Sequence, residues 1–380
     1  MFAGAATASY TYLQYRAIPL EVSATISQPP FTVPPAQPLA WPTYGQSAVA
    51  SKEYGVLATN GDTAPQPTAS TAKLITLLSI MTKRPFTDGQ GGTITFTGED
   101  VARYNAYVAG NGTVTPVVAG VQWTQYQAMQ AIQIDSANNV SDSLAIWAFG
   151  SLEEYRISTQ DMVERLGMHH TTIGTDASGY SPTTTSTAHD MAILMTHILD
   201  NPTLRDIIGQ STATLPWTGV IDGHSRIDRE GFIGGKTGYI PEAGGTYVLA
   251  GEQTINGHRH EIITAVLGAP HFPYAQRDAW TLYESAKANF SYQTILTGRQ
   301  RIGTYRPSWA EEIPVTSGDT VEMFIWGGMS PKAAIGVHDL SPNNQSQVGD
   351  ITISYGNWST TTPLVVDDVL TMPPWWYGLK

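Results

Sequence analysis

A serine and a lysine three residues apart, Ser70 and Lys73, open a stretch of sequence with helical spacing. Side chains three apart on a helix share one face, so these two can come within hydrogen-bonding distance. A serine hydroxyl becomes a nucleophile when a base removes its proton, and a lysine amine in a desolvated pocket can be that base. The pair therefore indicates covalent catalysis, although S-x-x-K alone is weak, because it also occurs as a capping serine beside a solvated lysine.

Two further short motifs follow the first along the chain. Ser136-Ala137-Asn138 comes directly after a second helical stretch, and Lys236-Thr237-Gly238 leads into strand-like sequence. The ordered set S-x-x-K, S-x-N and K-T-G is the signature of penicillin-binding proteins and class A β-lactamases. The combination is far more specific than any one of its members.

Helices must position the first two motifs. Leu74, Leu77, Leu78 and Met81 form an apolar stripe with helical spacing that begins at Ser70, and Pro85 ends the run. Further helices are predicted at 123–134, at 140–149, and after a capping box formed by Thr187 and Asp190.

Strands are predicted on both sides of these helices. Residues 48–50, 247–250 and 262–267 are apolar or β-branched, and the last two runs are typical of neighbouring antiparallel strands. Strands at both ends with helices between them indicate an α+β domain. After about residue 290, short alternating segments separated by turn signals predict a small all-β module.

The predicted domain organisation has three parts. Residues 1–44 form an N-terminal arm and linker, in which six prolines between Pro29 and Pro42 favour extended polyproline geometry. Residues 45–290 form the main α+β domain, and residues 291–380 form the β-rich domain. The first twenty residues are either the remnant of an export signal or anchor, or an ordered arm, and both alternatives stay open.

Composition excludes several classes of function. The net charge of −12 argues against a nucleic-acid partner, because phosphate binding needs clustered cations. The chain has no cysteine, which removes thiol nucleophiles and disulfides from consideration. No run of about 18 apolar residues predicts a transmembrane helix.

With these motifs in place, the chain resembles the D-alanyl-D-alanine carboxypeptidases, the low-molecular-mass penicillin-binding proteins of the serine peptidase type. Segments beyond the three motifs carry the resemblance over about 45–290: Leu166-Gly167-Met168, Thr185-Ser186-Thr187-Ala188-His189-Asp190-Met191 and Glu242-Ala243-Gly244. The β-module resembles the family's second domain more loosely. The resemblance implies a penicillin-binding/β-lactamase-like domain, an antiparallel sheet with a helical cluster, followed by a small all-β C-terminal domain.

The resemblance also implies catalytic roles. Ser70 would attack the carbonyl of a D-Ala-D-Ala peptide and form an acyl-enzyme, and Lys73 would take its proton. Ser136, with Lys236 nearby, would relay a proton to the leaving D-alanine. Asn138 would hold the substrate amide and Lys73.

Substrate binding is assigned in the same way to the third motif and its neighbours. The backbone N–H groups of Ser70 and Tyr239 would form the oxyanion hole. Thr237, within the K-T-G motif that Gly238 completes, would bind the terminal carboxylate of the substrate. Arg277 is the best match for the family's carboxylate-binding arginine; the alternative is a surface arginine paired with the neighbouring aspartate.

The implied substrate is a peptidoglycan stem peptide ending in D-Ala-D-Ala, and β-lactams would be covalent inhibitors. No metal or organic cofactor is expected. The implied location is the bacterial cell envelope outside the cytoplasm, either membrane-associated or secreted. Trp375, Trp376 and Tyr377 could provide peripheral membrane contact or could pack on the β-module.

One departure from the family concerns the second motif. The family usually has Ser-Gly-Asn-Asp-Ala, whereas this chain has Ser136-Ala137-Asn138-Asn139-Val140. The first change removes backbone freedom and the second removes a charge near the site. Both changes leave the reacting atoms in place, so activity is expected at an undetermined level.

Three other functions compete with this assignment. A class A β-lactamase needs a deacylating glutamate in a Glu-x-x-Leu-Asn pattern, which the corresponding stretch around His169 lacks. A non-catalytic wall-binding module is disfavoured by the intact motifs. A metallohydrolase is disfavoured because none of the nine histidines lies in an H-E-x-x-H motif.

Overall fold

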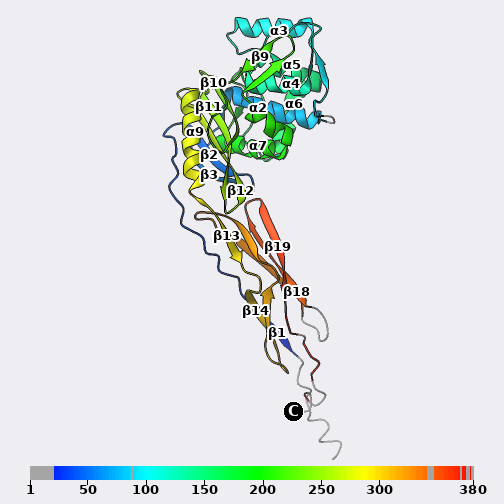
Figure 1. Cartoon of the computed structure of the whole chain (residues 1–380), viewed down its shortest axis with the longest axis vertical. Coiled ribbons are helices and arrows are strands. Elements are labelled where there is room, and N and C mark those ends of the chain that lie inside the picture. The colour runs from blue at the N-terminus through cyan, green and yellow to red at the C-terminus, as the bar shows by residue number, and fades with distance from the viewer. Residues whose placement is uncertain (1–20, 87–88, 340–345, 369, 374–376, 378–380) are drawn as a thin grey trace, which may run out of the picture. The chain divides into compact units, whose positions relative to one another are not determined.

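The computed structural model describes residues 21–86, 89–339, 346–368, 370–373 and 377 (Figure 1). Their Cα positions divide into two compact units. One unit is residues 37–290, and the other combines residues up to 36 with residues 291–380. None of the helices in the described ranges is long and apolar enough to cross a membrane.

A five-stranded sheet forms the centre of the unit 37–290. Each neighbouring pair of strands is antiparallel, and Val248 pairs with Ala265 in the two longest strands, which confirms the antiparallel pair predicted around these residues. The strand order is β10 (Phe232–Ile240), β11 (Gly244–Ile255), β12 (His258–Ala269), β2 (Gln46–Ser51) and β3 (Gly55–Gly61), so β10 lies at an edge.

Helices cover both faces of this sheet (Figure 1). On β12, Ile263 and Ala265 belong to the apolar core shared with the helical cluster, whereas Thr264 between them donates to the carbonyl of Ala279 on α9 at 2.9 Å. Successive strand residues point to opposite faces, so α9 and the cluster lie on different sides. The helices are α2 (Ala72–Lys83), α4 (Gln125–Ile134), α5 (Asn138–Phe149), α6 (Leu152–Arg165), α7 (Ala188–Asp200) and α9 (Phe272–Lys287).

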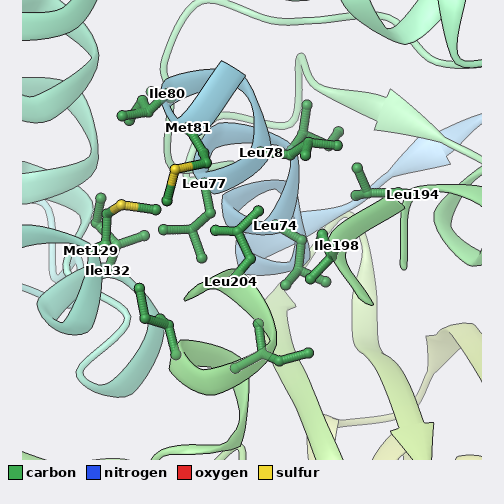
Figure 2. Packing of buried hydrophobic residues seen from close by; sticks show 14 of the residues in the cluster. Leu74, Leu77, Leu78, Ile80, Met81, Met129, Ile132, Leu194, Ile198 and Leu204 are labelled. Carbon is green, nitrogen blue, oxygen red and sulfur yellow. The ribbon is translucent and has the colours of Figure 1, made fainter. Parts of the chain in front are cut away.

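The helix that follows Ser70 is more deeply buried than its sequence indicated. The apolar stripe predicted one buried face, and its four residues do lie in the core together with Met129 and Ile132 of α4 (Figure 2). However, every residue from Ala72 to Met81 is buried. The polar members of the helix are satisfied locally, since Thr76 bonds the Tyr155 hydroxyl at 2.8 Å and Ser79 bonds Thr159 at 2.6 Å. Helix α2 is therefore the central helix of the unit.

The predicted capping box at α7 is only half formed. Thr187 accepts from the N–H of Asp190 as expected. The Asp190 carboxylate, however, accepts from the N–H of His170 and the hydroxyl of Thr171, at 2.8 and 2.9 Å. A buried carboxylate takes the donors that tertiary packing supplies, so Asp190 ties α7 to the preceding loop.

Shorter elements complete this unit. They are η1 (Ala69–Thr71), α3 (Gly98–Ala109), α8 (Pro202–Gly209), and three two-stranded pairs: β4 (Gln66–Pro67) with β7 (Thr185–Ser186), β5 (Thr93–Thr95) with β6 (Gln122–Thr124), and β8 (Thr212–Leu215) with β9 (Gly219–Asp222).

The second unit is built from strands. Its six-stranded sheet has the order β1 (Val22–Ile26), β14 (Arg301–Pro307), β15 (Ile313–Ser317), β19 (Trp358–Val365), β18 (Gln347–Tyr355) and β17 (Lys332–Val337), and β13 (Phe290–Leu296) pairs with β16 (Val321–Trp326). With the mixed unit 37–290, this unit confirms the predicted fold class.

The N-terminal region takes part in that sheet. Val22–Ile26 pairs with β14, so the segment expected to be an arm supplies an edge strand. The proline-rich stretch has no regular element, and Pro34 accepts from the N–H of Gly328 at 2.8 Å. The alternatives for residues 1–20 lie outside the described residues.

The aromatic triplet near the C-terminus is described only in part. Trp375 and Trp376 lie outside the described residues. Tyr377 donates to the carbonyl of Ser308, and its ring lies 6.4 Å from the ring of Trp309. Tyr377 therefore contacts the β-rich unit.

Candidate active site

Ser70 lies in the short turn η1, which leads directly into α2. The preceding Ala69 has φ +48°, a left-handed conformation that is strained for a residue with a Cβ. Gly179 approaches Ala69 so closely that a Cβ on it would lie 2.0 Å from the Ala69 carbonyl oxygen. The neighbouring loop therefore holds the backbone before Ser70 in an uncommon conformation.

Lys73 lies directly beside Ser70. Its Nζ is 2.7 Å from Ser70 Oγ, 2.8 Å from Asn138 Oδ1 and 2.8 Å from the Ser178 carbonyl oxygen. The Lys73 side chain is completely buried. The structure thus brings together the predicted nucleophile, the predicted base and the asparagine of the second motif.

The surroundings of Lys73 favour its neutral amine. Burial lowers its pKa well below the ordinary value, and the positive charge of Lys236 lowers it further. The carboxylates of Asp176 and Asp142 act in the opposite direction. A neutral amine near neutral pH can accept the proton of the Ser70 hydroxyl.

The two carboxylates are engaged elsewhere. Asp142, whose pKa burial raises to about 6, accepts from the Tyr107 hydroxyl at 2.7 Å and from the N–H of Ala177 at 2.9 Å. Asp176 accepts from the N–H groups of Ser178 and Ser181, at 2.7 and 3.0 Å. These bonds order the loop whose Ser178 carbonyl accepts from Lys73.

Ser136 and Lys236 form a second serine–lysine pair. Lys236 Nζ is 3.1 Å from Ser136 Oγ and 3.2 Å from the Thr237 carbonyl oxygen. Burial lowers the pKa of Lys236 to about 7, while the negative charge of Asp135 acts against that shift. Ser136 has φ +55°, so this serine too sits on strained backbone.

The third motif runs along the edge strand β10 next to η1. A Cβ on Gly238 would lie 2.8 Å from the Ser70 backbone nitrogen, so only glycine permits this approach. Tyr239 follows, and its ring lies 4.2 Å from the ring of His271. The approach of Gly238 to the Ser70 backbone places the start of η1 against β10, next to Tyr239.

Two cavities meet at Ser70 and Tyr239. One has a volume of about 420 Å³ and is lined by polar residues that include Asp135, Ser136, Asp222, His224, Ser225, Lys236, Thr237 and His271. The other has a volume of about 670 Å³ and includes Gly110, Asn111, Gly112, Thr113, Asn138, Tyr180, Ser181, Pro182, Ile240, Pro241 and Glu242. We refer to them as the Lys236 cavity and the Glu242 cavity.

Arg277 is the one predicted site residue that the structure does not bring to this cleft. It lines neither cavity. Its exposed side chain pairs with Asp278, with Nε 2.6 Å from Oδ1, and its guanidinium lies over the ring of Tyr274. This is the surface pairing considered as the alternative for Arg277.

Ser225 is a cleft residue that the sequence did not reveal. Its buried hydroxyl lies 3.0 Å from Thr237 Oγ1, 3.2 Å from the Thr237 backbone nitrogen and 3.5 Å from Lys236 Nζ. It precedes the third motif in a segment with no recognisable pattern, so no sequence signal identified it. His224 lies in the same segment, and His271 follows β12 without a motif around it, so neither was identified from the sequence.

The asparagine that departs from the family pattern has a defined partner. Asn139 is buried; its Oδ1 accepts from the N–H of Thr115 at 3.1 Å and its Nδ2 donates to the Thr115 carbonyl at 2.9 Å. An aspartate could accept but could not donate to that carbonyl. Asn139 therefore fixes the segment that carries Asn111 and Thr113 into the cleft.

Comparison with known proteins identifies the family. A family model described as D-alanyl-D-alanine carboxypeptidase matches residues 47–271, more than half of the chain. No curated protein sequence matches the chain.

Solved structures share the fold. Penicillin-binding protein 3 from Streptococcus pneumoniae has a TM-score of 0.65 at 17% identity, covering 88% of this chain and 100% of that one. Penicillin-binding protein 6B from Escherichia coli has a TM-score of 0.61 at 18% identity, covering 90% and 99%. D-alanyl-D-alanine carboxypeptidase from Mycobacterium tuberculosis has a TM-score of 0.54 at 22% identity, covering 70% and 96%.

These structural similarities show the fold, whereas the match to the family model identifies the type of reaction. Members of this family are serine enzymes of the cell envelope that act on the D-Ala-D-Ala end of peptidoglycan peptides and bind β-lactams. The chain belongs to the family of serine D-alanyl-D-alanine carboxypeptidases.

Proposed function

We propose that Ser70 is the nucleophile of this carboxypeptidase and that Lys73 is its general base. The observation that carries the proposal is the 2.7 Å separation of Lys73 Nζ from Ser70 Oγ at a completely buried amine. The neutral amine takes the hydroxyl proton as Ser70 Oγ bonds to the carbonyl carbon of the penultimate D-alanine. The negative charge that develops on the carbonyl oxygen is stabilised by the N–H groups of Ser70 and Tyr239, at about 3 kcal/mol for each donor.

The leaving D-alanine needs a proton on its nitrogen. Ser136 supplies that proton as the C–N bond breaks, and Lys236, 3.1 Å from Ser136 Oγ, replaces it. Water then attacks the Ser70 ester and gives a proton through Ser136 to Lys236, which lost one in the first step. Ser70 Oγ takes back the proton that Lys73 holds as the shortened peptide leaves, so both lysines return to their starting states. Asn138, which accepts from Lys73, keeps the amine aimed at Ser70.

The terminal carboxylate of the substrate is assigned to the Lys236 cavity. Thr237 and Ser225 present hydroxyls 3.0 Å apart there, and Lys236 supplies positive charge. Arg277 is left out of this assignment because it lines neither cavity and pairs with Asp278. The unit 37–290 is thus proposed as the catalytic domain, and residues 291–380 as an accessory β-rich domain.

Intact mass after addition of benzylpenicillin tests the nucleophile. We expect a single persistent adduct on the wild type and none on Ser70→Ala, together with D-alanine release from a D-Ala-D-Ala peptide by the wild type alone. Rapid drug loss without an adduct would indicate a β-lactamase. An unmodified drug and no D-alanine release would indicate a wall-binding module without turnover.

We also propose peripheral membrane contact by the C-terminal segment, because amphipathic aromatic residues favour the membrane interface. Co-sedimentation with liposomes of the full chain and of a chain lacking residues 373–380 tests it. Equal sedimentation of the two proteins would contradict membrane contact. The segment would then serve to pack Tyr377 on the β-rich unit.

A further inference from the structure

Asp142 is a buried carboxylate in the unit 37–290 that the proposed reaction does not use. It lies on α5 four residues after Asn138, so the two side chains share one face of the helix. Asn138 accepts from Lys73 on that face, and Asp142 accepts from two segments outside α5. A buried charge is unfavourable unless it is hydrogen-bonded, so the two segments that bind Asp142 indicate its role.

One oxygen of Asp142 holds the end of α3 and the segment that follows it. Oδ2 accepts from the Tyr107 hydroxyl at 2.7 Å. The Tyr107 carbonyl accepts from the N–H of Gly112 at 2.8 Å, and a Cβ on Gly112 would lie 2.9 Å from Asn138 Nδ2. Because Gly112 lines the Glu242 cavity, the bond to Tyr107 fixes part of that cavity wall to α5.

The other oxygen holds the loop that contacts Lys73. Oδ1 accepts from the N–H of Ala177 at 2.9 Å. The Ala177 carbonyl accepts from the Thr76 hydroxyl of α2 at 2.6 Å, and the next carbonyl, that of Ser178, accepts from Lys73 Nζ at 2.8 Å. The acceptor that orients the Lys73 amine is therefore one residue from the point where Asp142 fixes the loop.

The two segments that Asp142 binds also contact each other. The rings of Tyr107 and Tyr180 lie 5.3 Å apart in an edge-to-face arrangement, and the Tyr180 hydroxyl donates to the Gly110 carbonyl. Tyr180 and Gly110 both line the Glu242 cavity. Asp142 is thus part of one connected set of contacts that joins the cavity wall to the loop beside Lys73.

Asp142 also supplies charge at the step that Lys73 performs. When the amine takes the Ser70 proton, it becomes a buried ammonium ion, which is unfavourable without negative charge nearby. Burial and the charge of Lys236 lower the pKa of Lys73, whereas the carboxylates of Asp176 and Asp142 raise it. The charged and titratable groups that interact with Asp142 are Arg103 and Tyr107 on α3, Lys73 on α2, Tyr155 on α6 and Asp176 in the loop.

We propose that Asp142 is a positioning residue for acylation, which fixes the loop carbonyl that orients Lys73 and stabilises the positive charge that Lys73 acquires. The inference rests on the proposed function, since it needs Lys73 as the base, and it adds a residue outside the three motifs. Asp142→Asn separates charge from geometry. Its Oδ1 can still accept from Ala177 and its Nδ2 can donate to the Tyr107 hydroxyl, but the charge is lost.

The test is a double-mutant cycle on the rate of acylation by benzylpenicillin, followed by intact mass at pH 8, above the Asp142 pKa of about 6. The proteins are the wild type, Asp142→Asn, Lys73→Ala and the double variant. Asp142→Asn should slow acylation about tenfold in the wild type but less than about twofold in Lys73→Ala, because a residue that acts through Lys73 is not additive with it. The control Asp161→Asn, which removes an exposed carboxylate from α6, should acylate at the wild-type rate.

The pH profile of acylation gives a second readout that a merely structural role would not change. Loss of the Asp142 charge lowers the pKa of Lys73, so the acid limb of the profile should move to lower pH in Asp142→Asn, by about 0.5 or more. Equal slowing in both backgrounds, or an acid limb that stays in place, would overturn the inference while a slow Lys73→Ala variant still supports the proposed function. A Lys73→Ala variant that acylates at the wild-type rate would overturn both.

Discussion

We refer to the buried residues Lys73 and Lys236 as the floor of the cleft and to the exposed residues around it as its surface. Both regions carry charged side chains, but the floor is shielded from water and the surface is not. Lys73 and Lys236 on the floor are buried, and each lies within hydrogen-bonding distance of a serine hydroxyl. Glu242 and Arg277 are exposed to solvent. Burial shifts the pKa values of the two lysines, whereas exposed charges are screened by water. The floor is thus suited to proton transfer, and the surface to weak, adjustable recognition.

The largest effect is expected from removing the proposed base. Lys73→Ala should slow acylation by benzylpenicillin about 10³-fold, because a positioned general base contributes 10²- to 10⁴-fold. Lys83→Ala, which removes an exposed lysine from the end of the same helix, should acylate at the wild-type rate. The measurement is the rate of adduct formation by mass spectrometry. Equal rates for Lys73→Ala and wild type would remove Lys73 from the mechanism.

The buried lysines should also make stability depend on pH. The pKa of Lys236 is about 7 in the folded chain and about 10.4 when unfolded. Between these values the unfolded chain binds more protons, so the unfolding free energy rises with pH through that window, by on the order of 1 kcal/mol per pH unit. Urea unfolding from pH 7.5 to 9.5 should show this rise, and Lys236→Gln should flatten it. Parallel profiles for the two proteins would contradict the assignment.

A smaller effect is expected from changing Asn139, the buried asparagine that departs from the family pattern. Asn139→Asp should lower the unfolding free energy by about 1–3 kcal/mol at neutral pH, because it leaves the Thr115 carbonyl without its donor and buries a charge. Asn289→Asp is a useful comparison, since this residue also bonds backbone through its amide but lies far along the chain from the cleft segment. Asn139→Asp should also reduce the rate of acylation by benzylpenicillin, because the segment around Thr113 is displaced, whereas Asn289→Asp should leave that rate unchanged. Equal acylation rates for the two variants would contradict this role of Asn139.

The smallest effect is expected on the surface. Arg277→Ala should change kcat/KM less than about twofold, as for other exposed substitutions. Thr237→Val, which removes a hydroxyl that lines the Lys236 cavity, should lower it about tenfold. D-alanine release by the two variants measures the contrast. A large loss of activity in Arg277→Ala would restore the carboxylate-binding role that the resemblance implied.

Local patterns predicted much of the architecture. The stripe from Leu74 to Met81, the apolar runs of β11 and β12, and the alternating strands after residue 290 each reflect a periodicity of 3.6 or 2 that the backbone imposes. These patterns did not reveal that α2 is buried all round, because burial depends on the helices packed against it. Nor did they reveal that Val22–Ile26 joins a sheet formed by residues more than 270 positions later.

The sequence by itself determined the chemistry of this protein: three ordered motifs supply two serines, two lysines and an asparagine whose types allow acyl transfer. Tertiary structure alone decided how these groups work. Burial favours the neutral amine that the proposed role of Lys73 needs, strained backbone and a glycine contact hold the segment before Ser70, and packing brings Ser225 into the cleft while leaving Arg277 on the surface. The physical reason is that desolvation and hydrogen-bond geometry depend on neighbours distant in the chain, which no local spacing encodes.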